Sequence, residues 1–167
     1  FIKDSRLSLL KKYSIDELDF IFKLKNENLI LEDLNFSSNS INFYSDNLSI
    51  TNIDKEFYIK GDINNKITNL KSKKAQLLTN IFYSDIDFKD VKFSSVSDFS
   101  FKLNKKLKFK DIKINSKIKL NEVKISNFLE LKKFLPNIKD DIVLVNNDLE
   151  IEYSNENLFV NGYGDIL

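Results

Sequence analysis

The chain has 167 residues, about the length of one domain, and its 26 Lys and Arg nearly balance 25 Asp and Glu. These charges are interspersed, which argues against a nucleic-acid binder, because such a protein needs a concentrated basic face to collect phosphates. The absence of His, Cys, Met and Trp excludes a His-based triad, a cysteine nucleophile, a structural zinc site and the usual haem ligands. We therefore expect a protein that is not an enzyme and has no cofactor.

The ends of the sequence suggest a piece of a longer polypeptide. The chain begins at Phe1 instead of Met, and its last residues, 164–167, stop inside an expected strand. No apolar run approaches the roughly 18 residues of a membrane-spanning helix. We expect residues 1–167 to be one segment without an internal domain boundary, and any membrane anchor of the parent protein to lie outside it.

Alternating apolar and polar residues predict short strands in the first part of the chain, after residues 1–16, whose signals are mixed. We predict strands at residues 17–25, 29–36, 41–44, 48–50 and 56–63. Asp46 and Asn47 favour a turn between the third and fourth of these, since their side chains bond locally and tolerate a left-handed backbone. Gly61 indicates a bulge or a close backbone approach inside the fifth.

The pattern is weakest at residues 64–79. There, Lys71–Lys74 form a basic cluster typical of a loop, and Ala75–Leu78 fit either a helical turn or the next strand. A solvated turn explains the lysines better than contact with lipid headgroups or phosphate. Further strands are predicted at residues 80–93, 96–103, 107–114 and 118–125.

One helix is predicted at residues 127–135. Asn127 is a suitable N-cap, Pro136 ends the helix, and apolar residues between them recur with helical spacing. We expect this helix to lie across an end or a face of the sheet. The chain then returns to strands at residues 142–145, 149–153 and 158–160, the last leading into Gly162 and Gly164, which fit a strand bulge.

An acid interrupts the alternation at regular places. Leu107 and Phe109 alternate, Asp111 takes the next apolar position, and the alternation resumes one residue out of phase at Ile112 and Ile114. The same arrangement surrounds Asp33, Asp90 and Glu122, with a variant at Asn52. A one-residue shift moves side chains to the opposite strand face, so each acid predicts a bulge, a sharp bend or a very short turn. Which apolar pair faces inward, the one before or the one after the acid, is open.

The copies that start at Leu29, Leu48, Ile86 and Leu107 are separated by about 20 residues or twice that distance, which predicts one hairpin-sized unit per repeat. The copy that starts at Ile118 comes early, at about half a period. The stretch Asp85–Asp90 places two carboxylates on one strand face, the spacing that a calcium site or an acid/base pair might use. They lack the glycine and the terminal acid of a calcium loop, so a solvated strand face is the better interpretation.

The strict alternation predicts an antiparallel sheet with one apolar and one polar face. Two interpretations of the apolar face stay open. A second layer could cover it, which would give a sandwich or solenoid core. Alternatively, the face stays open and curls into a trough that accepts lipid chains.

The bent acidic repeat, the segment 128–136 and the ending Leu158–Leu167 with its Val160-x-Gly162-x-Gly164 pattern resemble the AsmA-like superfamily. This is the repeating β-groove superfamily of Gram-negative envelope proteins that includes TamB and YhdP. The resemblance covers most of the chain, but the N-terminal membrane helix of the family is missing from this sequence. It implies a mainly β fold, in which short antiparallel strands form a curled, twisted sheet with an open groove.

The same resemblance implies a periplasmic segment whose parent is anchored in the inner membrane and carries phospholipid between the inner and outer membranes. Its partners would be phospholipid acyl chains, neighbouring repeats of the same chain, and the membrane through parts outside this sequence, with no nucleic acid. We predict no catalytic and no metal-binding residues. The predicted groove residues are Leu29, Leu31, Phe43, Leu48, Ile50, Phe57, Ile59, Ile86, Phe88, Phe99, Phe101, Leu107, Phe109, Ile118 and Leu120. The alternative is a structural or adhesive β-repeat, a solenoid or sandwich with a closed core.

Overall fold

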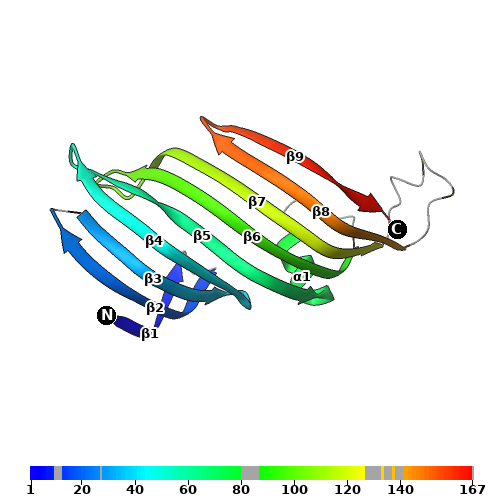
Figure 1. The fold of residues 1–167 in the computed structure, drawn as a ribbon. Coiled ribbons are helices and arrows are strands. Elements are labelled where there is room, and N and C mark those ends of the chain that lie inside the picture. The colour runs from blue at the N-terminus through cyan, green and yellow to red at the C-terminus, as the bar shows by residue number, and fades with distance from the viewer. Residues whose placement is uncertain are drawn as a thin grey trace. The chain divides into compact units, whose positions relative to one another are not determined.

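A computed structural model describes residues 1–9, 13–26, 28–79, 87–126, 133, 137 and 141–166. Within these residues the chain forms one nine-stranded antiparallel sheet, which is not closed into a barrel, and the strand order follows the sequence (Figure 1). The strands are β1 (Ile2–Leu9), β2 (Tyr13–Lys25), β3 (Asn28–Ser38), β4 (Ile41–Ile53), β5 (Glu56–Lys71), β6 (Asp87–Leu103), β7 (Phe109–Ser126), β8 (Asp141–Ser154) and β9 (Asn157–Ile166). The prediction of a mainly β, open antiparallel sheet is confirmed.

Several strands are longer than predicted, because segments expected to be turns continue the sheet. The predicted strands at 41–44 and 48–50 are both parts of β4. Likewise, β6, β7 and β8 each join two predicted strands. The polar residues between the predicted strands have hydrogen-bond partners on neighbouring strands. Ser116 Oγ on β7 donates to Ser97 Oγ on β6 at 2.9 Å, and Ser95 Oγ on β6 donates to Asn65 Oδ1 on β5.

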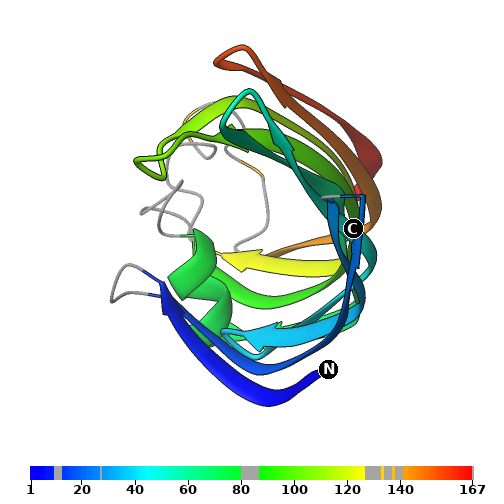
Figure 2. The ribbon, with the colours of Figure 1, turned by 90° about the vertical axis from the view of Figure 1, so that its left-hand side faces the viewer.

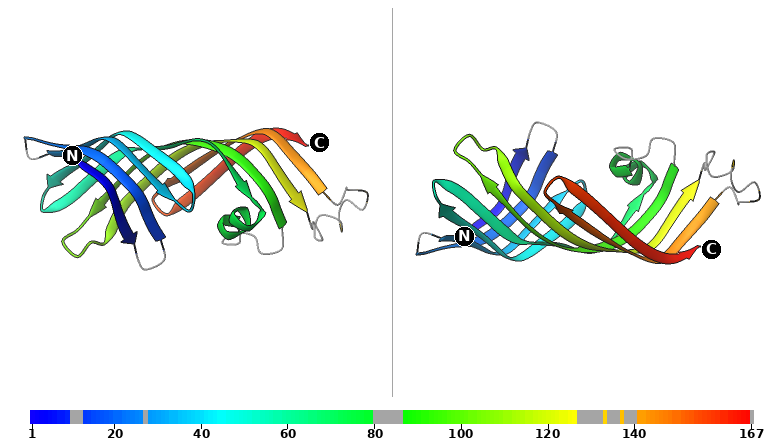
Figure 3. Two further views of the ribbon diagram at one scale, coloured as in Figure 1. Left: turned by 90° about the horizontal axis from the view of Figure 1, so that it is seen from below. Right: turned by 90° about the horizontal axis from the view of Figure 1, so that it is seen from above.

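The weak region at residues 64–79 resolves into the end of β5 followed by helix α1 (Ser72–Thr79). Ala75 of the helix is buried, and Gln76 Oε1 accepts a hydrogen bond from the Phe88 N–H at 3.0 Å. The helix therefore lies beside the start of β6 (Figures 2 and 3). The helix predicted at 127–135 lies outside the described residues, apart from Lys133.

Three hairpins turn on two residues that both have positive φ values. The turn residues are Asn39–Ser40, Asp54–Lys55 and Asn155–Glu156, with φ between 50° and 67°. Positive φ at both central positions is the pattern of a type I′ turn, whose twist matches that of the strands it connects. Each of these hairpins therefore fixes the register of its two strands locally.

The chain divides into two compact units. Unit 1 contains Phe1–Lys66, Ser95–Lys117 and Glu150–Asn161, and unit 2 contains Ile67–Ser94, Ile118–Leu149 and Gly162–Leu167. Strands β5 to β9 contribute residues to both units. That the chain is one segment without an internal domain boundary stays a prediction.

Candidate functional site

Two of the acids in the repeat adopt the backbone conformation of a bulge. Asp33 and Asp111 both have a φ of 51°, in the left-handed region. Around Asp33, β3 has two residues, Asp33 and Leu34, opposite the single residue Phe20 of β2. An extra residue of this kind restores the side-chain phase, so Leu31 before the acid and Leu34 after it point to the same face.

In unit 2, the apolar residues on both sides of Asp90 and of Glu122 also pack together on one face. A buried cluster there consists of Val123, Ile125 and Ile142, with Phe88, Val91, Leu120 and Leu144 packed against it. The cluster contains apolar residues from both sides of Asp90 and from both sides of Glu122. The question left open by the sequence is therefore answered for three of the acids: the apolar residues before and after Asp33, Asp90 and Glu122 share one face.

In unit 1 the strand register assembles a continuous apolar face. Directly paired residues of an antiparallel sheet point to the same side. Two rows of paired residues cross β2, β3, β4 and β5: Leu24, Leu29, Ile50 and Ile59 form one, and Phe22, Leu31, Leu48 and Gly61 form the other. Phe36 and Phe43 stack on neighbouring strands, with ring centroids 5.2 Å apart.

Aromatic residues of β6 and β7 form a second part of unit 1. The ring centroid of Phe101 lies 5.9 Å from that of Phe99 and 5.1 Å from that of Phe109. Such offset or tilted pairs contribute about 1 kcal/mol each beyond their area burial. The three rings thus form one contiguous aromatic surface on adjacent strands.

A hydrogen bond between β5 and β6 shows which face these rings occupy. Ser95 Oγ donates to Asn65 Oδ1, and Asn65 pairs with Phe43 of β4, so Ser95 lies on the face of Phe43. Phe99 and Phe101 lie on the same face as Ser95, because side chains alternate along a strand. We call this surface of β2 to β7 in unit 1 the apolar face.

Most of the predicted groove residues lie on the apolar face. These are Leu29, Leu31, Phe43, Leu48, Ile50, Phe57, Ile59, Phe99, Phe101 and Phe109. Ile59 is buried, but Phe57 remains 44% exposed and Phe109 61% exposed. Leu107 lies in the loop before β7 instead of in a strand. Phe88, Ile118 and Leu120 belong to unit 2, and Ile86 lies outside the described residues.

The turn predicted at residues 45–47 is a bulge inside β4. Tyr44 pairs with Asn64, and Leu48 pairs with Gly61, so β4 has one residue more than β5 between these pairs. A Cβ at Gly61 would lie 2.9 Å from the Asn47 carbonyl oxygen, so the predicted close backbone approach is confirmed. Asn52, the predicted variant of the repeat, instead continues the β4–β5 register without a shift.

The Asp62 carboxylate occupies the opening of this bulge. Its oxygens accept hydrogen bonds from the backbone N–H of Asp46 at 3.5 Å and of Asn47 at 3.4 Å. They also accept from Ser45 Oγ at 3.4 Å and Asn64 Nδ2 at 2.5 Å. The backbone donors freed by the bulge are thus satisfied by a charged acceptor. Sequence analysis did not identify Asp62, and its only signal was the neighbouring glycine.

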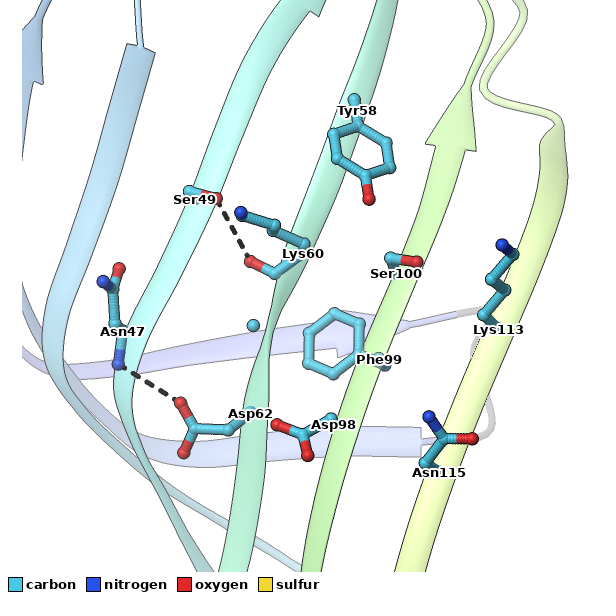
Figure 4. Close-up of a pocket in the computed structure, with 11 residues that line it drawn as sticks. Asn47, Ser49, Tyr58, Lys60, Asp62, Asp98, Phe99, Ser100, Lys113 and Asn115 are labelled. Atoms are coloured by element: carbon cyan, nitrogen blue, oxygen red, sulfur yellow. Dashed lines mark hydrogen bonds between the residues drawn. The ribbon is translucent and has the colours of Figure 1, made fainter. Parts of the chain in front are cut away.

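Asp62 also lines a polar hollow of about 450 Å³ in unit 1 (Figure 4). The hollow is lined by Asn47, Ser49, Tyr58, Lys60, Gly61, Asp62, Asp98, Phe99, Ser100, Lys113 and Asn115. Figure 4 shows Asp62 and Asp98 side by side on β5 and β6. In the part of the chain that the structure describes, no three acids are grouped as metal ligands. The hydrogen bonds of Asp62 assign it to the stability of β4.

The paired carboxylates near Asp90 are only partly described. Asp90 Oδ1 lies 3.0 Å from Lys71 Nζ, and Asp87 is exposed at the start of β6. Asp85 lies outside the described residues. The ion pair connects the end of β5 with β6 inside unit 2.

The ion pair at the Asp111 bulge predicts a pH effect. Lys102 Nζ lies 2.7 Å from Asp111 Oδ2, and the hydrogen bond and charge of Lys102 lower the pKa of Asp111 below its ordinary value of 3.8. A carboxyl group with a lowered pKa stabilises the fold above its unfolded pKa, and this stabilisation is lost as the pH falls through the lowered pKa. We expect NMR titration of the Asp111 carboxyl carbon to give a midpoint below 3.8 that returns toward this value in Lys102→Gln. An unchanged midpoint in the variant would show that the pair does not persist in solution.

Among the described residues, no helix has the length and hydropathy needed to span a membrane. Comparison of the chain with protein-family models, curated proteins and solved structures found no match. The AsmA-like resemblance therefore stays a prediction from the sequence pattern.

Proposed function

We propose that the apolar face of unit 1 binds the acyl chains of phospholipids, as a non-catalytic segment of an AsmA-like envelope protein. The observation that supports this proposal is a continuous apolar surface on which most side chains of the two paired rows keep partial access to solvent. Phe57 and Phe109 are 44% and 61% exposed, although both lie on the same face as the rows of leucine and isoleucine. Contiguous exposed apolar surfaces are typical of ligand or interaction sites.

Unit 2 provides an internal comparison. Its cluster of Val123, Ile125 and Ile142 is only 3% to 8% exposed, the value expected of a packed core. Unit 1 also has buried apolar residues, Leu34, Ile41 and Ile59, but within its two paired rows Ile59 alone is buried. This difference favours unit 1 as the place where a ligand contributes the missing apolar contacts.

The energetics of such binding need no reactive side chain. Each methylene group moved from water onto an apolar surface contributes about 0.8 kcal/mol. Leucine, isoleucine and phenylalanine would shield the acyl chain, while the phosphate headgroup would stay in water. The parent protein would extend the face with neighbouring repeats and carry phospholipid between the inner and outer membranes from a periplasmic position.

Photo-crosslinking tests this proposal directly. A benzoylphenylalanine at position 109 would replace an exposed ring of the apolar face, and a matched variant would carry the same group at Lys60 on the opposite face. After incubation with vesicles of phosphatidylethanolamine and phosphatidylglycerol, and removal of the vesicles before irradiation, we expect phospholipid adducts at position 109 and few at position 60. Mass spectrometry of the purified chain would identify them.

The competing structural interpretation predicts another result. If the protein is an adhesive or structural repeat with a closed core, position 109 would crosslink to protein and not to lipid. Equal adducts at both positions would indicate non-specific contact with vesicles. Either result would overturn the proposal.

A further inference from the structure

Exposed apolar residues of unit 1 gather where its hairpins turn. The hairpins β2–β3, β4–β5, β6–β7 and β8–β9 all turn at the same end of the strands (Figure 1). We call this border of the sheet the turn edge. The exposed residues in or near these turns are Phe22, Leu24, Ile53, Phe57, Leu107, Phe109, Leu158, Phe159 and Val160, with exposed fractions from 44% to 76%. Their concentration at the turn edge distinguishes it from the scattered apolar residues of an ordinary surface.

The β6–β7 hairpin adds positive charge to the turn edge. Lys105, Lys106, Lys108 and Lys110 alternate around the exposed Leu107 and Phe109. Lys110 Nζ lies 2.8 Å from Glu56 Oε1. Within the described residues, the other three lysines form no ion pair, so their charges are available to a partner.

The neighbouring β4–β5 hairpin contributes another lysine. Lys55 lies with the β6–β7 loop around a hollow of about 460 Å³. The hollow is lined by Asp54, Lys55, Glu56, Asn104, Lys105, Lys106 and Lys108. Its four lysines outnumber its two acids, and Glu56 is already paired with Lys110. The site as a whole therefore favours an anion.

Asn104 holds the β6–β7 loop in one conformation. Its side-chain oxygen accepts hydrogen bonds from the backbone N–H of Lys106 at 2.9 Å and of Lys108 at 3.1 Å. Its carbonyl oxygen accepts from the Leu107 N–H at 2.8 Å. Leu107 has a φ of 56° and is 70% exposed, so a bulky apolar residue occupies a strained position without burying its side chain. The loop thus presents this leucine to a partner.

We infer that the β6–β7 hairpin, together with Lys55, docks on the surface of a bilayer that contains anionic phospholipid. The chemistry of the loop matches the two layers of such a surface. Lysine side chains would contact the phosphate groups, while Leu107 and Phe109 would enter the boundary between headgroups and acyl chains. This contact goes beyond acyl-chain binding on the apolar face, because it depends on the lysines and on Leu107.

Vesicle flotation of the full chain tests the inference. We expect the chain to float with vesicles of phosphatidylcholine containing one quarter phosphatidylglycerol, and much less with phosphatidylcholine alone. Combined Lys105→Gln, Lys106→Gln and Lys108→Gln should weaken binding by about a hundredfold, since each lysine near an anionic surface contributes roughly a fivefold effect. The matched control is Lys71→Gln, Lys73→Gln and Lys74→Gln, which removes three charges near α1 and should leave flotation unchanged.

Leu107→Asn separates the apolar contribution from the charges. Asparagine tolerates a positive φ, so the loop is expected to keep its conformation while it loses the apolar side chain. Flotation should fall at least fivefold, with an unchanged urea midpoint. Equal binding to neutral vesicles, no effect of either β6–β7 variant, or an equal loss in the control would overturn the inference.

Two further measurements identify the partner. Inorganic phosphate should compete with the vesicles no better than sodium chloride at equal ionic strength, and stronger competition would indicate a phosphate site instead of a membrane surface. Lipid retained after vesicle removal, measured by native mass spectrometry, reports on the apolar face alone. Lost flotation with retained lipid would overturn only membrane docking, and the converse would overturn only acyl-chain binding.

Discussion

Asp62→Ala is expected to lower the free energy of unfolding by about 2 kcal/mol. The substitution removes a charged acceptor from the backbone N–H groups of Asp46 and Asn47 at the β4 bulge, and from Asn64 Nδ2. Because the bulge has displaced these groups from the regular β4–β5 ladder, they would lose their charged acceptor in the variant and would depend on water. Urea denaturation followed by circular dichroism would measure the change.

Asp98→Ala is the matched control for this prediction. Asp98 lines the same polar hollow as Asp62, but no hydrogen bond connects it to the bulge within the described residues. We expect this variant to differ from the unmodified chain by less than about 0.5 kcal/mol. Equal losses in both variants would show that charge in the hollow, and not support of the bulge, determines stability.

Gly61→Ala is expected to destabilise the chain by about 2 kcal/mol. The added Cβ would lie 2.9 Å from the Asn47 carbonyl oxygen and 3.1 Å from the Leu48 Cα. Both are backbone atoms of β4, so the strand itself would have to move. In an unstrained position the same substitution stabilises proteins by about 0.4–1 kcal/mol. A decrease in the free energy of unfolding of Gly61→Ala would therefore point to the close contact with β4.

Gly162→Ala makes the same substitution at a glycine whose nearest neighbour is a flexible side chain instead of backbone. A Cβ there would meet the end of the Leu149 side chain, which can change rotamer. We expect a loss of less than about 1 kcal/mol. If Gly61→Ala proved no more destabilising than Gly162→Ala in urea denaturation, the close approach at the β4 bulge would be wrong.

Much of the sheet was predictable because apolar alternation is a local signal. It predicted the fold class, and the shift at Asp33 and Asp111 predicted the bulges that the positive φ values confirm. The strand ends were less predictable. A serine that ends a strand and a serine that bonds across strands have the same local sequence, so Ser95 and Ser116 were misread as parts of breaks.

The candidate surfaces were likewise predictable where their signal is local in the sequence, and not where it depends on the pairing of strands. The phase of alternation, corrected for the bulges, places ten predicted groove residues on the apolar face. Asp62 was missed because its partners at the β4 bulge lie on the preceding strand, 15 or 16 residues away in the sequence. The combination of Lys55 with Lys105 was missed for the same reason, since only the sheet brings the two hairpins together.

The sequential strand order has a kinetic consequence. Each strand pairs with the next strand of the chain, so most contacts join residues that are near in the sequence, and the contact order is low for a β protein. We expect the sheet to form one hairpin after another, with the type I′ turns at Asn39–Ser40 and Asp54–Lys55 as early local nuclei. In such a quasi-one-dimensional array, a hairpin can be inserted or deleted without rerouting the rest of the chain. Evolution can thus change the length of this sheet in hairpin-sized steps.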